Sequence, residues 1–156
     1  MNQVVVKQEK SGYQIVEAYK SLRTNLQFCG EDKKVIAVTS CTPNEGKSSV
    51  SMQLGISLAE SGKRVILIDA DLRKSVLLGR TKTQKSVRGL AHFLSGQATL
   101  EDVICSTNVK NFYMIYSGPF PPNPAELLGG KNFRSLLNAL RKVYDYVIVD
   151  TPPLGS

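Results

Sequence analysis

A Gly-Lys-Ser tripeptide is the first feature of the sequence that could carry chemistry. Gly46, Lys47 and Ser48 follow an apolar run and precede an amphipathic stretch, which is the setting of a loop that binds phosphate between a strand and a helix. In such a loop, backbone N–H groups point at phosphate oxygens, the lysine adds a positive charge, and the serine hydroxyl can bind Mg²⁺. The tripeptide could also stand at a helix start by chance. Its context favours a site for ATP with Mg²⁺.

The residues around the tripeptide extend this predicted loop. We expect nucleotide contacts from Pro43, Asn44, Glu45, Gly46, Lys47, Ser48 and Ser49. Gly46 would let the backbone approach the phosphates closely, because glycine has no Cβ. The longer pattern GxxxxGK[ST] is not met, since Cys41 occupies the position of its first glycine. The prediction therefore depends on the flanking elements as well as on the tripeptide.

Two further apolar runs each end in a carboxylate. RVILID, residues 64–69, ends at Asp69, with Asp71 two residues later, and YDYVIVD, residues 144–150, ends at Asp150. In an open parallel sheet, ligands bind at the carboxyl ends of the strands, so Asp69 and Asp150 should meet beside the phosphate loop. Mg²⁺ prefers oxygen ligands, and we predict a metal site of Ser48, Asp69 and Asp150. Asp71 could instead cap a helix or pair with Arg73.

The elements that must position these residues alternate between strands and helices. The patterns predict a helix over 13–28, strands over 33–40, 64–69, 112–118 and 144–150, a helix carrying Val50, Leu54 and Leu58, a polar loop over 71–88, short helices over 90–94 and 100–104, and a helix after Ala125 with Phe133, Leu136, Leu137 and Leu140 on its apolar face. This alternation predicts an α/β fold of three layers, in which helices flank a mainly parallel central sheet.

Composition limits the class of protein. The chain has 156 residues, of which 42% are hydrophobic, which suits one domain. Its amino terminus lacks the apolar region of a secretory signal and no run reaches the length of a membrane span, so we expect a cytoplasmic protein. The three cysteines suggest neither disulfides nor a zinc site. The net charge of +7 favours anionic partners, but it cannot choose among nucleotides, acidic lipid and nucleic acid.

The run VTSCTPNEGKSSVSMQLGISLAESGKRVILIDADLRKS resembles the bacterial tyrosine kinases of capsular and exopolysaccharide systems, within the P-loop NTPases. Gly46 to Ser48 would be Walker A, Ile68 to Asp71 Walker A′, and Val147 to Asp150 Walker B. EAYKSLRTNLQF at 17–28 and PPNPAELL at 121–128 also resemble signatures of that family. The resemblance covers nearly the whole chain.

The resemblance implies residue roles and an activity. Lys47, Asp69, Asp71 and Asp150 would be catalytic in phosphoryl transfer from ATP to a tyrosine hydroxyl, and the aspartate that acts as base is left open. Residues 1–30 would form an amino-terminal helical segment for assembly into a ring through Glu17, Lys20 and Arg23, where a lysine replaces the arginine of the family pattern; an ordinary solvated helix face is the alternative. Residues 31–156 would form the nucleotide-binding domain, which we expect to be incomplete at its carboxyl terminus.

The family also implies partners. These are a transmembrane polysaccharide co-polymerase that activates the kinase at the inner face of the membrane, and tyrosine-containing protein substrates; no nucleic acid is expected. Basic residues of the polar loop, such as Arg73 and Lys74, could face acidic lipid or solvent. The sequence lacks the carboxyl-terminal tyrosine cluster of the family.

Two other functions stay open from the sequence. One is an ATPase switch of the partitioning and division-site class, although Thr42 stands where that class carries a signature lysine. The other is an inert fragment that binds nucleotide and assembles without catalysis.

Overall fold

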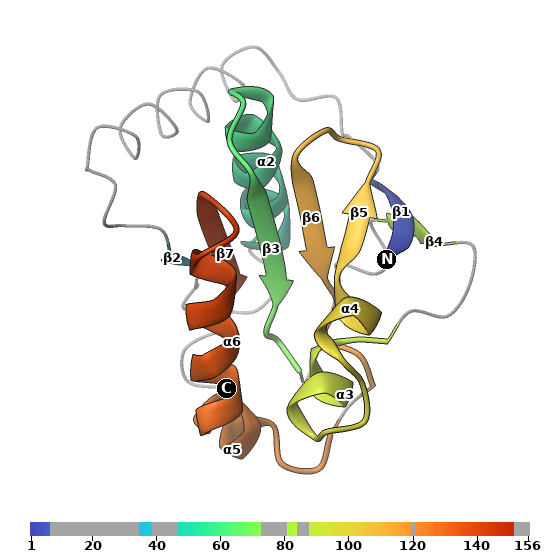
Figure 1. The fold of residues 1–156 in the computed structure, drawn as a ribbon, viewed down its shortest axis with the longest axis vertical. Helices are drawn as coiled ribbons and strands as arrows, with labels where there is room; N and C mark the ends of the chain where they lie inside the picture. Colours follow the sequence, from blue (N-terminus) through green and yellow to red (C-terminus); the bar gives the residue numbers. More distant parts are fainter. Residues whose placement is uncertain (7–34, 39–46, 73–80, 84–87, 120, 152–156) are drawn as a thin grey trace.

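The computed structural model describes residues 1–6, 35–38, 47–72, 81–83, 88–119 and 121–151. Within these residues, seven strands form one sheet in the order β2-β7-β3-β6-β5-β1-β4 (Figure 1). The strands are β1 Asn2–Val6, β2 Val35–Val38, β3 Val65–Asp69, β4 Thr81–Thr83, β5 Cys105–Thr107, β6 Phe112–Ile115 and β7 Tyr146–Asp150.

Most neighbouring strands run parallel. The pairs β2–β7, β7–β3, β3–β6 and β5–β1 are parallel, whereas β6–β5 and β1–β4 are antiparallel. The four strands β2, β7, β3 and β6 form a parallel block in which each chain crossover passes through a helical segment, as parallel pairing requires. The predicted α/β class with a mainly parallel sheet is confirmed.

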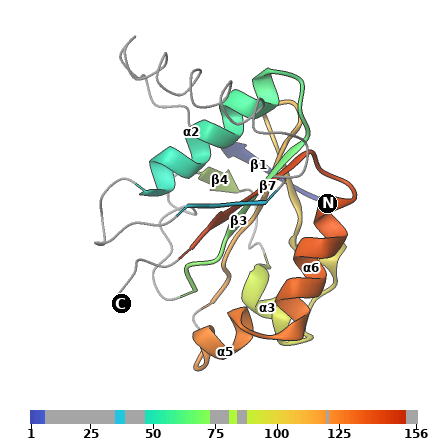
Figure 2. The same cartoon turned by 90° about the vertical axis from the view of Figure 1, so that its left-hand side faces the viewer.

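Helices cover both faces of the sheet, so the fold has three layers. Helix α2, Lys47–Glu60, lies on one face, and α3 Leu90–Leu94, α4 Leu100–Val103 and α6 Lys131–Arg141 lie on the other, with α5 Pro124–Leu128 leading into α6 (Figure 2). Two hydrophobic clusters fill the layers, one holding Leu54 and Leu58 of α2 and the other holding Leu136 and Leu140 of α6. Side chains of each central strand alternate between the two clusters.

Burial explains why the central strands are continuous apolar runs. Every residue of β3 and β7 is buried, as expected for parallel strands covered on both faces. Helix α2 approaches the sheet closely at Gly55, where a Cβ would lie 2.5 Å from Cε1 of the buried Phe112. The absence of a side chain at Gly55 therefore allows α2 to pack this close to the sheet.

Three strands were not predicted from the sequence. β1 alternates, with Val4 and Val6 buried and Val5 exposed, and it pairs with β5 and β4, so residues 2–6 belong to the sheet. β4 lies inside the stretch predicted to be a loop. The predicted helix over 100–104 ends at Val103, because Ile104 takes an extended conformation and the chain enters β5.

The remaining expectations on elements have mixed outcomes. The short helix over 90–94 and the helix carrying Phe133 are confirmed. The predicted helix over 13–28 lies outside the described residues, so the boundary at residue 30 stays a prediction. None of the helices among the described residues is long and apolar enough to cross a bilayer.

Candidate functional site

Three parallel strands end side by side at one edge of the sheet. Asp150 at the end of β7 is in register with Val38 of β2 on one side and with Asp69 of β3 on the other. Adjacent strands lie about 4.8 Å apart, so the two carboxylates are direct cross-strand neighbours. The predicted convergence of Asp69 and Asp150 is what this register produces.

The alternation of side chains decides which face the carboxylates share. Tyr146 and Ile148 of β7 pack in the same cluster as α2, and so do Val65 and Leu67 of β3. Counting on by two residues puts Asp150 and Asp69 on that same α2 side. Both carboxylates are 1% exposed, a degree of burial that is rare for a charged group unless other groups interact with it.

Asp71 lies in a tight turn that directly follows Asp69 and is bonded to the end of β7. Its backbone N–H donates to Oδ1 of Asp69 at 3.1 Å, while the N–H of Ala70 donates to the carbonyl of Asp150 at 2.9 Å. Asp71 is itself buried. These two hydrogen bonds therefore keep Asp69, Asp71 and Asp150 close together at the ends of β3 and β7.

Helix α2 begins at this same edge. Its first residue is Lys47, and Figure 1 shows that it starts on the side of the sheet towards which β3 and β7 run. The free N–H groups of a helix start give a partial positive charge that attracts anions. The backbones of Lys47, Ser48 and Ser49 form this first turn. Pro43, Asn44, Glu45 and Gly46 lie outside the described residues, as do Glu17, Lys20 and Arg23.

Thr151 is a site residue that sequence reasoning missed. Its backbone N–H and its Oγ1 both donate to the carbonyl of Val38, at 3.0 and 2.8 Å. This double contact ties the exit of β7 to the end of β2, where the chain leaves towards the predicted phosphate loop. No local pattern in the sequence marks Thr151, because both hydrogen bonds reach back to Val38 on another strand.

Ser51 is a second residue that was missed. It is fully buried on α2, one turn after Lys47, and its hydroxyl has no hydrogen-bond partner among the residues that the structure describes. An unpaired buried hydroxyl costs about 1–3 kcal/mol. We therefore expect Ser51 to lower the stability of the fold slightly next to the helix start. Its burial, which the sequence does not show, is what distinguishes it from other serines.

The donor set at the strand ends fits a hard divalent cation. Asp69 and Asp150 offer carboxylate oxygens, which Mg²⁺ prefers, and Mg²⁺ needs only one or two protein carboxylates when phosphate and water complete its shell. In the described part of the chain, no group of three or more His, Cys, Asp or Glu side chains could hold a metal ion by itself. Bound phosphate and water would complete the shell of a cation held by these two carboxylates. The predicted set of Ser48, Asp69 and Asp150 stays a prediction.

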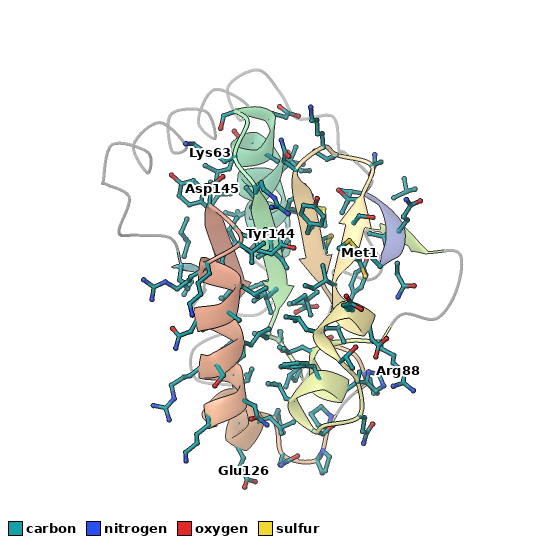
Figure 3. All side chains as sticks on the ribbon, viewed as in Figure 1. Met1, Lys63, Arg88, Glu126, Tyr144 and Asp145 are labelled. Atoms are coloured by element: carbon teal, nitrogen blue, oxygen red, sulfur yellow. The ribbon has the colours of Figure 1, made fainter. Side chains whose placement is uncertain are left out.

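A different cluster occupies the opposite edge of the sheet, where the strands begin. The guanidinium carbon of Arg64 lies 5.7 Å from the ring centre of Tyr113 and 5.3 Å from that of Tyr144. The backbone N–H of Arg64 donates to Oδ2 of Asp145 at 2.8 Å. Figure 3 shows Tyr144 and Asp145 near the start of β7. Burial raises the pKa of the Tyr144 hydroxyl. These contacts anchor the starts of β3 and β7 and are structural.

Comparison with known proteins agrees with this geometry. The family model described as an AAA domain matches residues 33–156, so the fold is that of a P-loop NTPase, a nucleotide-binding class. The tyrosine-protein kinase CpsD of Streptococcus agalactiae is 45% identical over 139 residues, which cover 89% of this chain and 61% of that protein. The solved BceF tyrosine kinase domain is 43% identical with a TM-score of 0.81, covering 90% of this chain and 57% of that one.

The chain belongs to the bacterial tyrosine kinase family of the P-loop NTPases. The septum site-determining protein MinD of Pyrococcus horikoshii, solved with Mg-ADP, is less similar, at 27% identity and a TM-score of 0.64, covering 78% of this chain and 49% of that one. The chain spans about three fifths of the length of the streptococcal CpsD proteins that it matches.

Proposed function

We propose that this chain is the nucleotide-binding part of an ATP-dependent protein-tyrosine kinase that phosphorylates itself and regulates the synthesis and export of capsular or exopolysaccharide. One observation carries the proposal. The start of α2 and the buried carboxylates of Asp69 and Asp150 lie at one strand edge, in a chain similar to proteins named tyrosine-protein kinases. This arrangement suits the charge neutralisation that phosphoryl transfer demands.

Each residue of the edge has a proposed role. The helix start and Lys47 would bind the phosphates of ATP and neutralise charge on the transferring group. Ser48, Asp69 and Asp150 would hold Mg²⁺, which supplies charge neutralisation when bound. Asp71, tied to Asp69 through its N–H, would orient the tyrosine hydroxyl together with Asp69, and either carboxylate could accept its proton. Pro43, Asn44, Glu45, Gly46 and Ser49 would complete the phosphate loop.

The acceptor tyrosine would come from outside the described core. Tyr116, Tyr144 and Tyr146 are buried and lie within the packed layers, where a kinase could reach them only after unfolding. Tyr113 stacks edge-on against Tyr144 and beneath Arg64. These four tyrosines fit structural roles, so we propose that the substrate is a tyrosine on another protein or on another copy of the kinase.

Assembly and partners follow as further parts of the proposal. The segment up to residue 30, of which residues 2–6 belong to the sheet as β1, would join copies into a ring through Glu17, Lys20 and Arg23 and so present each chain to its neighbour. A transmembrane polysaccharide co-polymerase would activate the kinase, and would hold it at the inner face of the cell membrane. Nucleic acid is not a proposed partner.

A phosphotransfer assay tests the proposed activity. The purified chain is mixed with Mg-ATP and a tyrosine-rich carboxyl-terminal peptide of a bacterial tyrosine kinase, and phosphotyrosine is measured by mass spectrometry. Lys47→Met is the control, because it removes the phosphate-binding charge and leaves the described core unchanged. We expect phosphotyrosine with the natural chain and none with Lys47→Met. Equal amounts of phosphotyrosine from the natural chain and from Lys47→Met would contradict the proposed site.

The similarity to MinD supports a second candidate function. This is an ATPase switch whose nucleotide state controls a partner. Hydrolysis of ATP without phosphotyrosine, stimulated by DNA or by another partner, would favour the switch. Nucleotide binding with neither activity would favour an inert fragment that assembles.

A further inference from the structure

Helix α6 carries a basic stripe on its outer side. Lys131, Arg134, Arg141 and Lys142 are all exposed, and at 100° per residue they fall within an arc of about 100°. The opposite side of the helix carries Phe133, Leu136 and Leu140, which are buried against the sheet. Lys142 keeps a helical backbone, so the stripe runs for about 16 Å along one straight element.

No acidic residue interrupts this basic stripe. The segment from Lys131 to Lys142 contains four cations and no Asp or Glu, which gives it a formal charge of +4 out of +7 for the whole chain. Glu126 and Asp145 lie beyond its two ends (Figure 3). Across the residues that the structure describes, the four cationic side chains make no hydrogen bond and no ion pair.

We propose that the basic stripe of α6 is a contact surface for an anionic lipid bilayer. Four unpaired cations in one line would face a plane of anionic headgroups simultaneously, and each cation near such a surface contributes about 1 kcal/mol, or about fivefold in affinity. The exposed side of α6 has no aromatic residue on which nucleic acid bases could stack.

The position of α6 is compatible with the candidate site. α6 covers one face of the sheet and α2 covers the other (Figure 2), while Asp69 and Asp150 lie on the α2 side of the strand edge. A bilayer against the outer side of α6 would leave that edge uncovered. The surface is argued independently of the proposed kinase activity, so each can fail without the other.

Vesicle co-sedimentation tests the proposal with the full chain. The vesicles contain phosphatidylcholine alone or with 30% phosphatidylglycerol, a composition that makes the surface anionic. The stripe variant is Arg134→Gln with Arg141→Gln. The matched control is Lys63→Gln with Lys110→Gln, which removes the same two charges from exposed positions away from α6. Circular dichroism checks that all three proteins are folded.

We expect binding to the anionic vesicles only, weakened by added salt. The stripe variant should bind about 30-fold more weakly, at about fivefold for each lost cation, and the control should stay within about fivefold of the natural chain. Equal losses in the two variants would mean that net charge alone drives binding and would overturn the proposal. A failure to bind anionic vesicles would also overturn the proposal. So would binding to a DNA duplex, instead of to the vesicles, that is lost in the stripe variant.

Discussion

Replacing Gly55 by alanine tests how α2 is seated on the sheet. The new Cβ would lie 2.5 Å from Cε1 of Phe112 and 3.1 Å from its Cζ. Ordinary contact begins at 3.4 Å, so the ring or the helix must move by about 0.9 Å at this point. Phe112 is 1% exposed and its ring is enclosed by the cluster, so the movement displaces other packed groups.

Two opposing effects set the magnitude. Overpacking of a core costs about 1–3 kcal/mol, whereas exchanging glycine for alanine inside a helix gains about 1 kcal/mol. Because the overlap involves a ring that cannot leave the core, we expect the upper part of the first range. Gly55→Ala should therefore lower the free energy of unfolding by about 1–2 kcal/mol.

A double-mutant cycle with Phe112→Leu isolates this contact. The shorter side chain vacates the space that the new Cβ would enter, so Gly55→Ala should become neutral or stabilising by about 1 kcal/mol in that background. The assay is urea unfolding followed by circular dichroism, with the slope checked for constancy. If Gly55→Ala stabilises the natural chain by the same amount as it stabilises the Phe112→Leu variant, the seating of α2 on Phe112 is refuted.

Three further perturbations test the described core. Gly89→Ala should cost about 2 kcal/mol, because its Cβ would lie 2.3 Å from the backbone nitrogen of Gly118, while Gly130→Ala, with nothing nearer than 3.4 Å, should cost clearly less in thermal unfolding. Ser51→Ala should stabilise by about 1 kcal/mol, since it removes an unpaired buried hydroxyl; a lower melting temperature would show that the hydroxyl has a partner. Burial raises the pKa of the Cys105 thiol from 9.0 to about 11, so iodoacetamide at pH 8 should label it only in denaturant. Stability should fall as pH rises from 9 towards 11, because the unfolded thiol ionises first; rapid labelling of the native chain would contradict this.

The sequence predicts the parallel block of the sheet well, for physical reasons. β3 and β7 are apolar at every position because both faces are covered, and such runs are visible without a structure. Each ends in an aspartate, and the carboxyl ends of parallel strands meet at one edge. The convergence of Asp69 and Asp150 was therefore predictable from two runs and one rule of topology.

The far side of the sheet was not predictable in the same way. β4 and β5 have three residues each, too few for a periodic pattern to stand out. β1 does alternate, but its partner β5 lies about a hundred residues away along the chain, with Asn2 in register with Cys105. Pairing of that kind is set by tertiary packing and leaves no local signal. Thr151 was missed for a similar reason, because its hydrogen bonds reach back to Val38.

The most direct test of the central claim is the affinity for Mg-ATP, measured by calorimetry with Asp150→Asn. This change keeps the shape of a buried side chain at the strand edge and removes its charge; Glu101→Gln, at an exposed position, is the matched control. We predict Mg²⁺-dependent binding to the natural chain and to the control, and a loss of about tenfold or more in the Asp150→Asn variant. Unchanged affinity and unchanged Mg²⁺ dependence in a folded Asp150→Asn variant would contradict a nucleotide site at this edge.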